Sequence, residues 1–125
     1  IEENVIYFGR KKQNELPLYY NSIDLFIASS MLMESLGLIG LEAMSCAIPV
    51  AGSNRGGIAT YVDDGLNGYL FEAGSANDLV LVIKKYYFLS DDHRQVLSEQ
   101  AIKTASKYEL EYVNDKLGKK LQNLT

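Results

Sequence analysis

The chain has 125 residues, which is the length of one ordinary domain with its own hydrophobic core. Apolar residues make up 47% and charged residues 22%, so the composition is that of a folded globular domain and excludes a disordered chain. The net charge of −4 excludes a general nucleic-acid binder, which needs a basic face. Small anionic ligands remain compatible with it, because local helix ends decide their binding.

Strands and helices are predicted to alternate along the chain. A strand of β-branched and aromatic residues is predicted at Asn4–Gly9, followed by a short helix over residues 14–20. The apolar run at 23–28 leaves no polar face and predicts a buried strand. Further strands are expected at 48–51 and 69–71. This order is typical of a Rossmann-like α/β fold, a parallel sheet with helices on both faces.

The helices have recognisable start signals. Leu38 and Leu41 recur at helical spacing after Gly37, which predicts a helix between the strands at 23–28 and 48–51. Ser75 followed by Asp78 resembles a capping box and predicts a helix start. Two more helices are expected, one from Ser90 or Asp91 and one over residues 110–124.

The junction before the helix at Leu38 is the candidate ligand site. Gly37 lacks a Cβ and permits a close approach of ligand to backbone. The first amides of a helix have no internal partners and carry partial positive charge, so they suit a phosphate or a sugar hydroxyl. Two carboxylates bracket this point: Glu34 in the loop just ahead, and Glu42 about one turn into the helix.

Glu34 and Glu42 are separated by seven residues. Set in Glu34-Ser35-Leu36-Gly37-Leu38-Ile39-Gly40-Leu41-Glu42-Ala43-Met44, they resemble the E-x7-E signature of retaining glycosyltransferases with the GT-B fold, closest to the large family four. Three later blocks are similar to that family in the same order: Ile48-Pro49-Val50-Ala51-Gly52-Ser53, Gly56-Gly57-Ile58 and Asp64-Gly65-Leu66-Asn67-Gly68-Tyr69-Leu70-Phe71. The resemblance runs from about Asn4 to Ser106.

The resemblance implies the donor-binding C-terminal part of a two-domain enzyme. Such an enzyme transfers a sugar from a nucleotide donor, UDP- or GDP-linked, to an acceptor hydroxyl with retained anomeric configuration. By this resemblance Glu34 is the catalytic residue that orients the donor sugar, and Glu42 accepts hydrogen bonds from the ribose. The remaining donor-binding residues it implies are Ser35, Leu36, Gly37 and Leu38. No metal and no cofactor besides the donor substrate are implied.

The resemblance also implies how the chain is divided. Residues 1–106 would form a partial nucleotide-sugar-binding domain whose first strands are absent, and 107–125 a C-terminal helix packing on an absent domain or partner. The glycan or lipid-linked acceptor would bind the missing N-terminal domain. The isolated chain is therefore expected to be inactive. An exposed strand edge is expected to allow self-association.

The lone cysteine, Cys46, excludes an internal disulfide and is typical of a reducing compartment. No apolar run has membrane-spanning length. We therefore expect a cytoplasmic protein, with the cytoplasmic face of a membrane as the alternative for a longer parent. Because the sequence begins with Ile1 instead of Met, such a parent is expected.

The sequence leaves several alternatives open. A nucleotide-sugar epimerase of the same fold and a non-catalytic nucleotide-sugar-binding module are the alternative functions. Ser35 is either a ligand contact or a helix cap. Arg55 is either a phosphate contact or a solvated loop residue, and Asp63 with Asp64 forms a turn more readily than a metal pair. Ala47 departs from the glycine usual in the resembling family.

Overall fold

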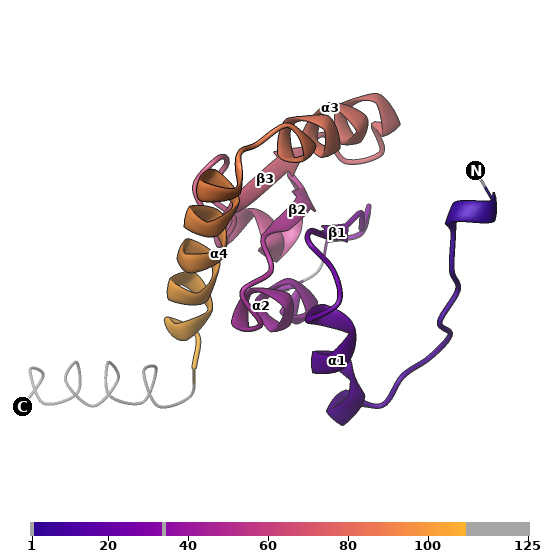
Figure 1. Cartoon of the computed structure of the whole chain (residues 1–125), viewed down its shortest axis with the longest axis vertical. Helices are drawn as coiled ribbons and strands as arrows, with labels where there is room; N and C mark the ends of the chain where they lie inside the picture. The colour runs from indigo at the N-terminus through magenta and orange to yellow at the C-terminus, as the bar shows by residue number, and fades with distance from the viewer. Residues whose placement is uncertain (1, 34, 110–125) are drawn as a thin grey trace, which may run out of the picture.

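The fold is a small parallel sheet flanked by helices, described here from a computed structural model of the chain (Figure 1). The structure describes residues 2–33 and 35–109. The strands are β1 (Phe26–Ala28), β2 (Val50–Ser53) and β3 (Gly68–Phe71). The α-helices are α1 (Leu16–Tyr20), α2 (Leu38–Ser45), α3 (Ala76–Tyr87) and α4 (Asp91–Ser106). Short 3-10 helices cover Glu2–Asn4, Gln13–Glu15 and Gly56–Thr60.

The strands pair in the order β1-β2-β3, and both pairs are parallel. Phe26 is in register with Val50, and Val50 with Gly68. Gly68 is required at that point, because a Cβ there would lie 2.2 Å from the carbonyl oxygen of Val50. The α/β class predicted from the sequence is confirmed.

Helices cover both faces of the sheet, as predicted. All four residues of the central strand β2 are buried, and successive side chains of a strand point to opposite faces. Val50 belongs to a core cluster with residues of α1, α2 and α4, whereas Ala51 belongs to a second cluster with residues of α3. Helix α4 contributes Leu97 to the second cluster and Ala101 to the first, so this helix packs against both core clusters.

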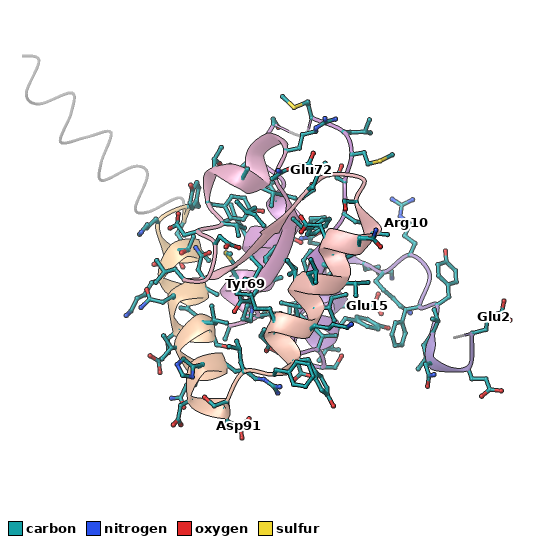
Figure 2. The ribbon with its side chains drawn as sticks, turned by 90° about the horizontal axis from the view of Figure 1, so that it is seen from above. Glu2, Arg10, Glu15, Tyr69, Glu72 and Asp91 are labelled. Carbon is teal, nitrogen blue, oxygen red and sulfur yellow. The ribbon has the colours of Figure 1, made fainter. Side chains whose placement is uncertain are left out.

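The predicted strand at Asn4–Gly9 is wrong. Residues 5–12 have no regular secondary structure, and this segment extends away from the rest of the fold (Figure 1). In Figure 2, Glu2 and Arg10 lie on this projecting side. Tyr7 is 92% exposed. A strand is stable only when a neighbour satisfies its backbone, and no strand of the described sheet lies beside this segment.

The remaining boundaries agree with the predictions within a few residues. The strand predicted at 23–28 is shorter, and the strand predicted at 48–51 is displaced toward Ser53. Ser75 caps α3 by accepting a hydrogen bond from the Asp78 amide at 3.1 Å, and Ser90 caps α4. The helix predicted over 110–124 lies outside the described residues, as does most of the proposed C-terminal segment 107–125.

Candidate functional site

Helix α2 begins where the loop that follows β1 ends. Gly37, the residue before the helix, has φ 70° and ψ 55°, the left-handed conformation that glycine adopts without steric cost. Gly37 is buried, whereas Leu38 is 63% exposed. The structure thus places the glycine at the junction where the sequence predicted it, with the first turn of α2 reaching solvent.

This loop packs against the glycine-rich segment after β2. A Cβ on Gly57 would lie 2.2 Å from the Cα of Leu36 and 2.5 Å from the carbonyl oxygen of Ser35. The Ser53 hydroxyl donates to the Ser30 carbonyl at 2.7 Å. Two loops at the carboxyl ends of neighbouring parallel strands therefore meet, which is where open α/β sheets bind ligands.

Glu42 projects from α2 toward α1. Its Oε1 accepts a hydrogen bond from Gln13 Nε2 at 2.7 Å, and its Oε2 accepts one from the Tyr20 hydroxyl at 3.1 Å. The side chain is half-buried. The carboxylate is therefore held in one orientation by two donors from the preceding segment.

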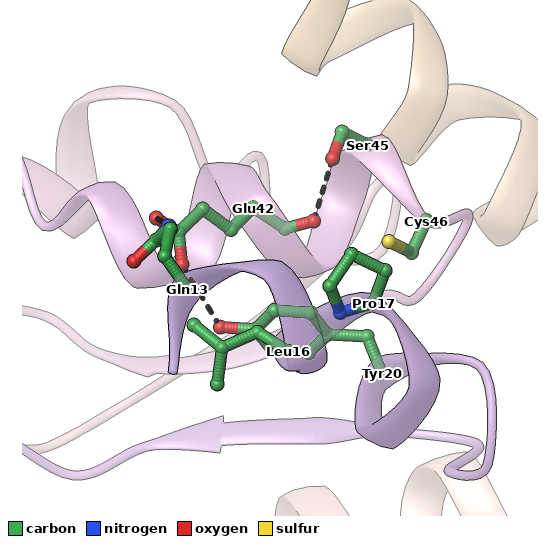
Figure 3. A pocket seen from close by; sticks show the side chains of 7 residues that line it. All are labelled: Gln13, Leu16, Pro17, Tyr20, Glu42, Ser45 and Cys46. Atoms are coloured by element: carbon green, nitrogen blue, oxygen red, sulfur yellow. Dashed lines mark hydrogen bonds between the residues drawn. The ribbon is translucent and has the colours of Figure 1, made fainter. Parts of the chain in front are cut away.

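A cavity of about 100 Å³ lies beside this carboxylate (Figure 3). It is lined by Gln13, Leu16, Pro17, Tyr20, Glu42, Ser45 and Cys46. A second hollow, of about 250 Å³, lies along α2 on the side of α4 and includes Leu36, Leu38, Glu42 and Tyr108. Glu42 therefore borders both spaces.

Tyr20 is 8% exposed, and burial raises its pKa to about 12. The negative charge of Glu42 and the hydrogen bond to it act in the same direction. At neutral pH the phenol therefore stays protonated and remains a donor to the carboxylate.

The structure brings some predicted site residues together. Leu36, Leu38 and Glu42 line the same hollow, and Gly37 connects them. Ser35 is exposed in this loop, but the helix cap is Gly37, so the alternative role of Ser35 as the capping residue is wrong. Glu34 lies outside the described residues.

Sequence reasoning missed the partners of this site. The sequence singled out neither Gln13 nor Tyr20, whereas both donate to Glu42. Tyr61 donates its hydroxyl to the Gly37 carbonyl at 2.7 Å across 24 residues of sequence. No local pattern signals such a contact; the bulky aromatic within an otherwise glycine-rich and small-residue stretch was the available hint.

Asp63 and Asp64 form a turn, as preferred from the sequence. The Asp63 carbonyl accepts from the Leu66 amide, and Asp64 Oδ1 accepts from the Leu70 amide at 2.9 Å. Across residues 2–33 and 35–109, no group of three or more His, Cys, Asp or Glu side chains is arranged to hold a metal ion. Nor does any helix in these ranges have the length and apolarity needed to cross a membrane.

Known proteins resemble this chain along most of its length. Residues 1–104 match the family model described as glycosyl transferases group 1. The chain is 30% identical over 98% of its length to lipopolysaccharide 1,2-N-acetylglucosaminetransferase of Salmonella typhimurium, and 32% identical over 83% to sulfoquinovosyl transferase of Arabidopsis thaliana. It spans 32% and 21% of the lengths of these two proteins.

Solved structures share the fold. Anabaena HepE in complex with UDP superposes with a TM-score of 0.86 at 24% identity, covering 98% of this chain and 33% of that one. The C-terminal domain of a group 1 glycosyl transferase (LpcC) from Francisella tularensis superposes with a TM-score of 0.65 at 26% identity, covering 85% of this chain and 53% of that one. With its parallel sheet, its glycine-led helix and this family match, the chain belongs to the glycosyl transferases group 1 family of GT-B type.

Proposed function

We propose that this chain binds the nucleotide-sugar donor of a glycosyltransferase that transfers the sugar to an acceptor hydroxyl with retained configuration. The single observation that carries the proposal is the pairing of a glycine-led helix start with an oriented carboxylate one turn later on the same helix. The match to the C-terminal domain of the Francisella protein supports assignment to the donor side of a two-domain enzyme.

In this proposal the start of α2 binds the donor diphosphate. The amides around Leu36, Gly37 and Leu38 stabilise the negative charge that develops on the leaving nucleotide. Ser35 is exposed at the same loop and supplies a hydroxyl to the donor. HepE is described in complexes with UDP and with UDP-glucose, so UDP is the first nucleotide to test here, with GDP as the second.

Glu42 accepts hydrogen bonds from the ribose hydroxyls. A carboxylate has about four acceptor sites, and Gln13 and Tyr20 occupy two of them. The remaining lone pairs are sufficient for two hydroxyl groups. Because two protein donors already orient the carboxylate, little conformational freedom is lost when the ribose binds.

Glu34 orients the donor sugar, and the acceptor binds a domain outside this chain. Transfer requires donor and acceptor in one fixed geometry, a requirement that can account for several kcal/mol of the barrier. The isolated chain is therefore expected to catalyse no transfer. Acceptor-dependent turnover by the purified 125-residue chain would contradict this part of the proposal.

Substitution of Glu42 in the full-length enzyme tests the donor role. Hydrogen bonds to a charged group contribute about 1.5–3 kcal/mol, so Glu42→Ala is expected to reduce kcat/KM for the donor roughly tenfold to a hundredfold. Tyr20→Phe is the matched control, because it removes a hydrogen bond between α1 and α2 but keeps the carboxylate. Equal losses in the two variants would contradict a direct ribose contact by Glu42, because the hydrogen bond to Tyr20 would then account for the whole effect.

Glu34→Gln tests whether Glu34 acts on the sugar of the donor and not on its nucleotide. It is expected to reduce turnover while affinity for the free nucleoside diphosphate stays nearly intact, measured by calorimetry. Turnover that proceeds without an added acceptor would instead indicate a hydrolase or an epimerase.

A further inference from the structure

Tyr61 reaches the start of α2 from a different part of the fold. It follows the 3-10 helix Gly56–Thr60 and is 3% exposed. Its hydroxyl donates to the carbonyl oxygen of Gly37 at 2.7 Å in a buried hydrogen bond. The same carbonyl accepts the Gly40 amide at 3.1 Å, so both of its lone pairs have protein donors.

The close packing of Tyr61 on α2 requires a glycine. A Cβ on Gly40 would lie 2.1 Å from the Tyr61 hydroxyl oxygen, which is far inside van der Waals contact. Gly40 is one helical turn from Gly37 and lies on the buried side of α2. The ring therefore rests directly on the helix backbone, and the hydroxyl has one fixed position.

The backbone of Tyr61 is itself anchored. Asn67 is fully buried and donates from Nδ2 to the Tyr61 carbonyl and to the Thr104 hydroxyl, both at 2.8 Å. Asn67 Oδ1 accepts the Asp63 amide at 2.8 Å. A hydrogen-bonded chain therefore connects α4, through Asn67 and Tyr61, to the carbonyl of Gly37.

The geometry of the peptide bond makes this carbonyl important for a ligand. The Gly37 carbonyl and the Leu38 amide belong to one planar trans peptide unit, in which C=O and N–H point in opposite directions. Holding the oxygen toward Tyr61 therefore directs the Leu38 amide hydrogen away from the core. Leu38 is the first residue of α2, and the first amides of a helix lack intrahelical acceptors.

We propose that Tyr61 is a positioning residue for the donor diphosphate. Its hydroxyl fixes the orientation of the Gly37–Leu38 peptide, so that the amide of Leu38 is aligned for an anion before the donor binds. This inference rests on the proposed donor-binding function, and Tyr61 itself touches no part of the donor.

Tyr61→Phe in the 125-residue chain tests the inference, with UDP as the probe. The matched control is Tyr86→Phe, because the Tyr86 hydroxyl also donates to a backbone carbonyl, that of Asp24, at 2.7 Å, within the other core cluster. Both variants keep the ring and lose one hydrogen bond of the same kind. Two quantities are measured by nuclear magnetic resonance: the ¹⁵N order parameter of the Leu38 amide and the UDP affinity from a titration.

Tyr61→Phe is expected to lower the Leu38 order parameter and to weaken UDP binding roughly threefold to tenfold, the range of one neutral hydrogen bond. Tyr86→Phe is expected to leave both quantities at the wild-type value. Equal behaviour of the two variants, or an unchanged Leu38 order parameter in Tyr61→Phe, would overturn the positioning role. If the wild-type chain binds no UDP, the UDP assignment of the proposed function fails, while the order parameters still decide the role of Tyr61.

Discussion

Ala47 adopts a backbone conformation that suits glycine better than alanine. Its φ is 64°, and it is the one non-glycine residue with a positive φ in the ranges that the structure describes. Ala47 lies between α2 and β2. Its amide donates to the Met44 carbonyl, and the Ile48 amide donates to the Ala43 carbonyl. The chain keeps the left-handed turn despite the alanine.

Ala47→Gly is expected to stabilise the chain. The left-handed conformation costs an alanine roughly 1–2 kcal/mol, and glycine avoids this cost. Glycine also has more conformational freedom in the unfolded chain, which offsets part of the gain in stability. The free energy of unfolding should therefore rise by about 0.5–1 kcal/mol, measured by urea denaturation. Ala73→Gly, at a position without positive φ, is the control and should be neutral or destabilising. A lower midpoint for Ala47→Gly would show that the turn is unstrained.

At the scale of elements, the contact between α1 and α2 depends on a protonated phenol. The Tyr20 hydroxyl donates to Glu42, and the pKa of Tyr20 is raised to about 12 from an ordinary value of 10.0 by burial first and by the Glu42 charge second. Because the folded state favours the neutral phenol, this group stabilises the fold fully below pH 10 and loses its contribution as the pH rises to about 12.

Tyr20→Phe is therefore expected to flatten the alkaline loss of stability. Wild-type chain should lose stability between pH 10 and about 12, and the variant should lose less over the same interval. Burial also raises the pKa values of Tyr69 and Tyr86, so part of the loss remains in the variant. Denaturant midpoints across this pH range measure the difference. Parallel pH profiles for the two proteins would show that Tyr20 ionises as freely as in the unfolded chain.

At the scale of the molecule, β1 is an edge strand of the described sheet. The Phe26 amide donates to the Pro49 carbonyl on the side of β2. Since backbone groups of a strand alternate between its two sides, the amide and carbonyl of Ile27 point toward the open edge. An edge with free backbone groups is a template for a further strand. Self-association through β1 stays a prediction.

Ile27→Pro is the sharpest test of that prediction. Proline removes the amide that faces the open edge and leaves the pairing with β2 in place. The wild-type chain should show a mass that rises with concentration in light scattering after size exclusion, and Ile27→Pro should abolish the rise. Ile27→Ala is the control, because it shortens the 40% exposed side chain but keeps the amide. Equal masses for all three proteins at every concentration would exclude pairing through this edge.

The sequence by itself determined the features that depend on neighbouring residues. Strand and helix alternation follows from hydrophobic periodicity, and the caps at Ser75 and Ser90 follow from local hydrogen bonding, so the α/β class and the junction at Gly37 were predictable. Glu42 was predicted as a site residue on spacing and resemblance; its role stays a prediction.

Tertiary structure alone decided the rest. The run Asn4–Gly9 has strand-forming residues but no neighbouring strand, and strand formation needs a partner outside the run itself. The donors that hold Glu42, and the Tyr61 hydroxyl that holds Gly37, come from 22 or more residues away. A hydrogen bond over such a separation leaves no periodic trace in the sequence, because it depends on where the packed elements bring two side chains, and packing is set by the whole fold.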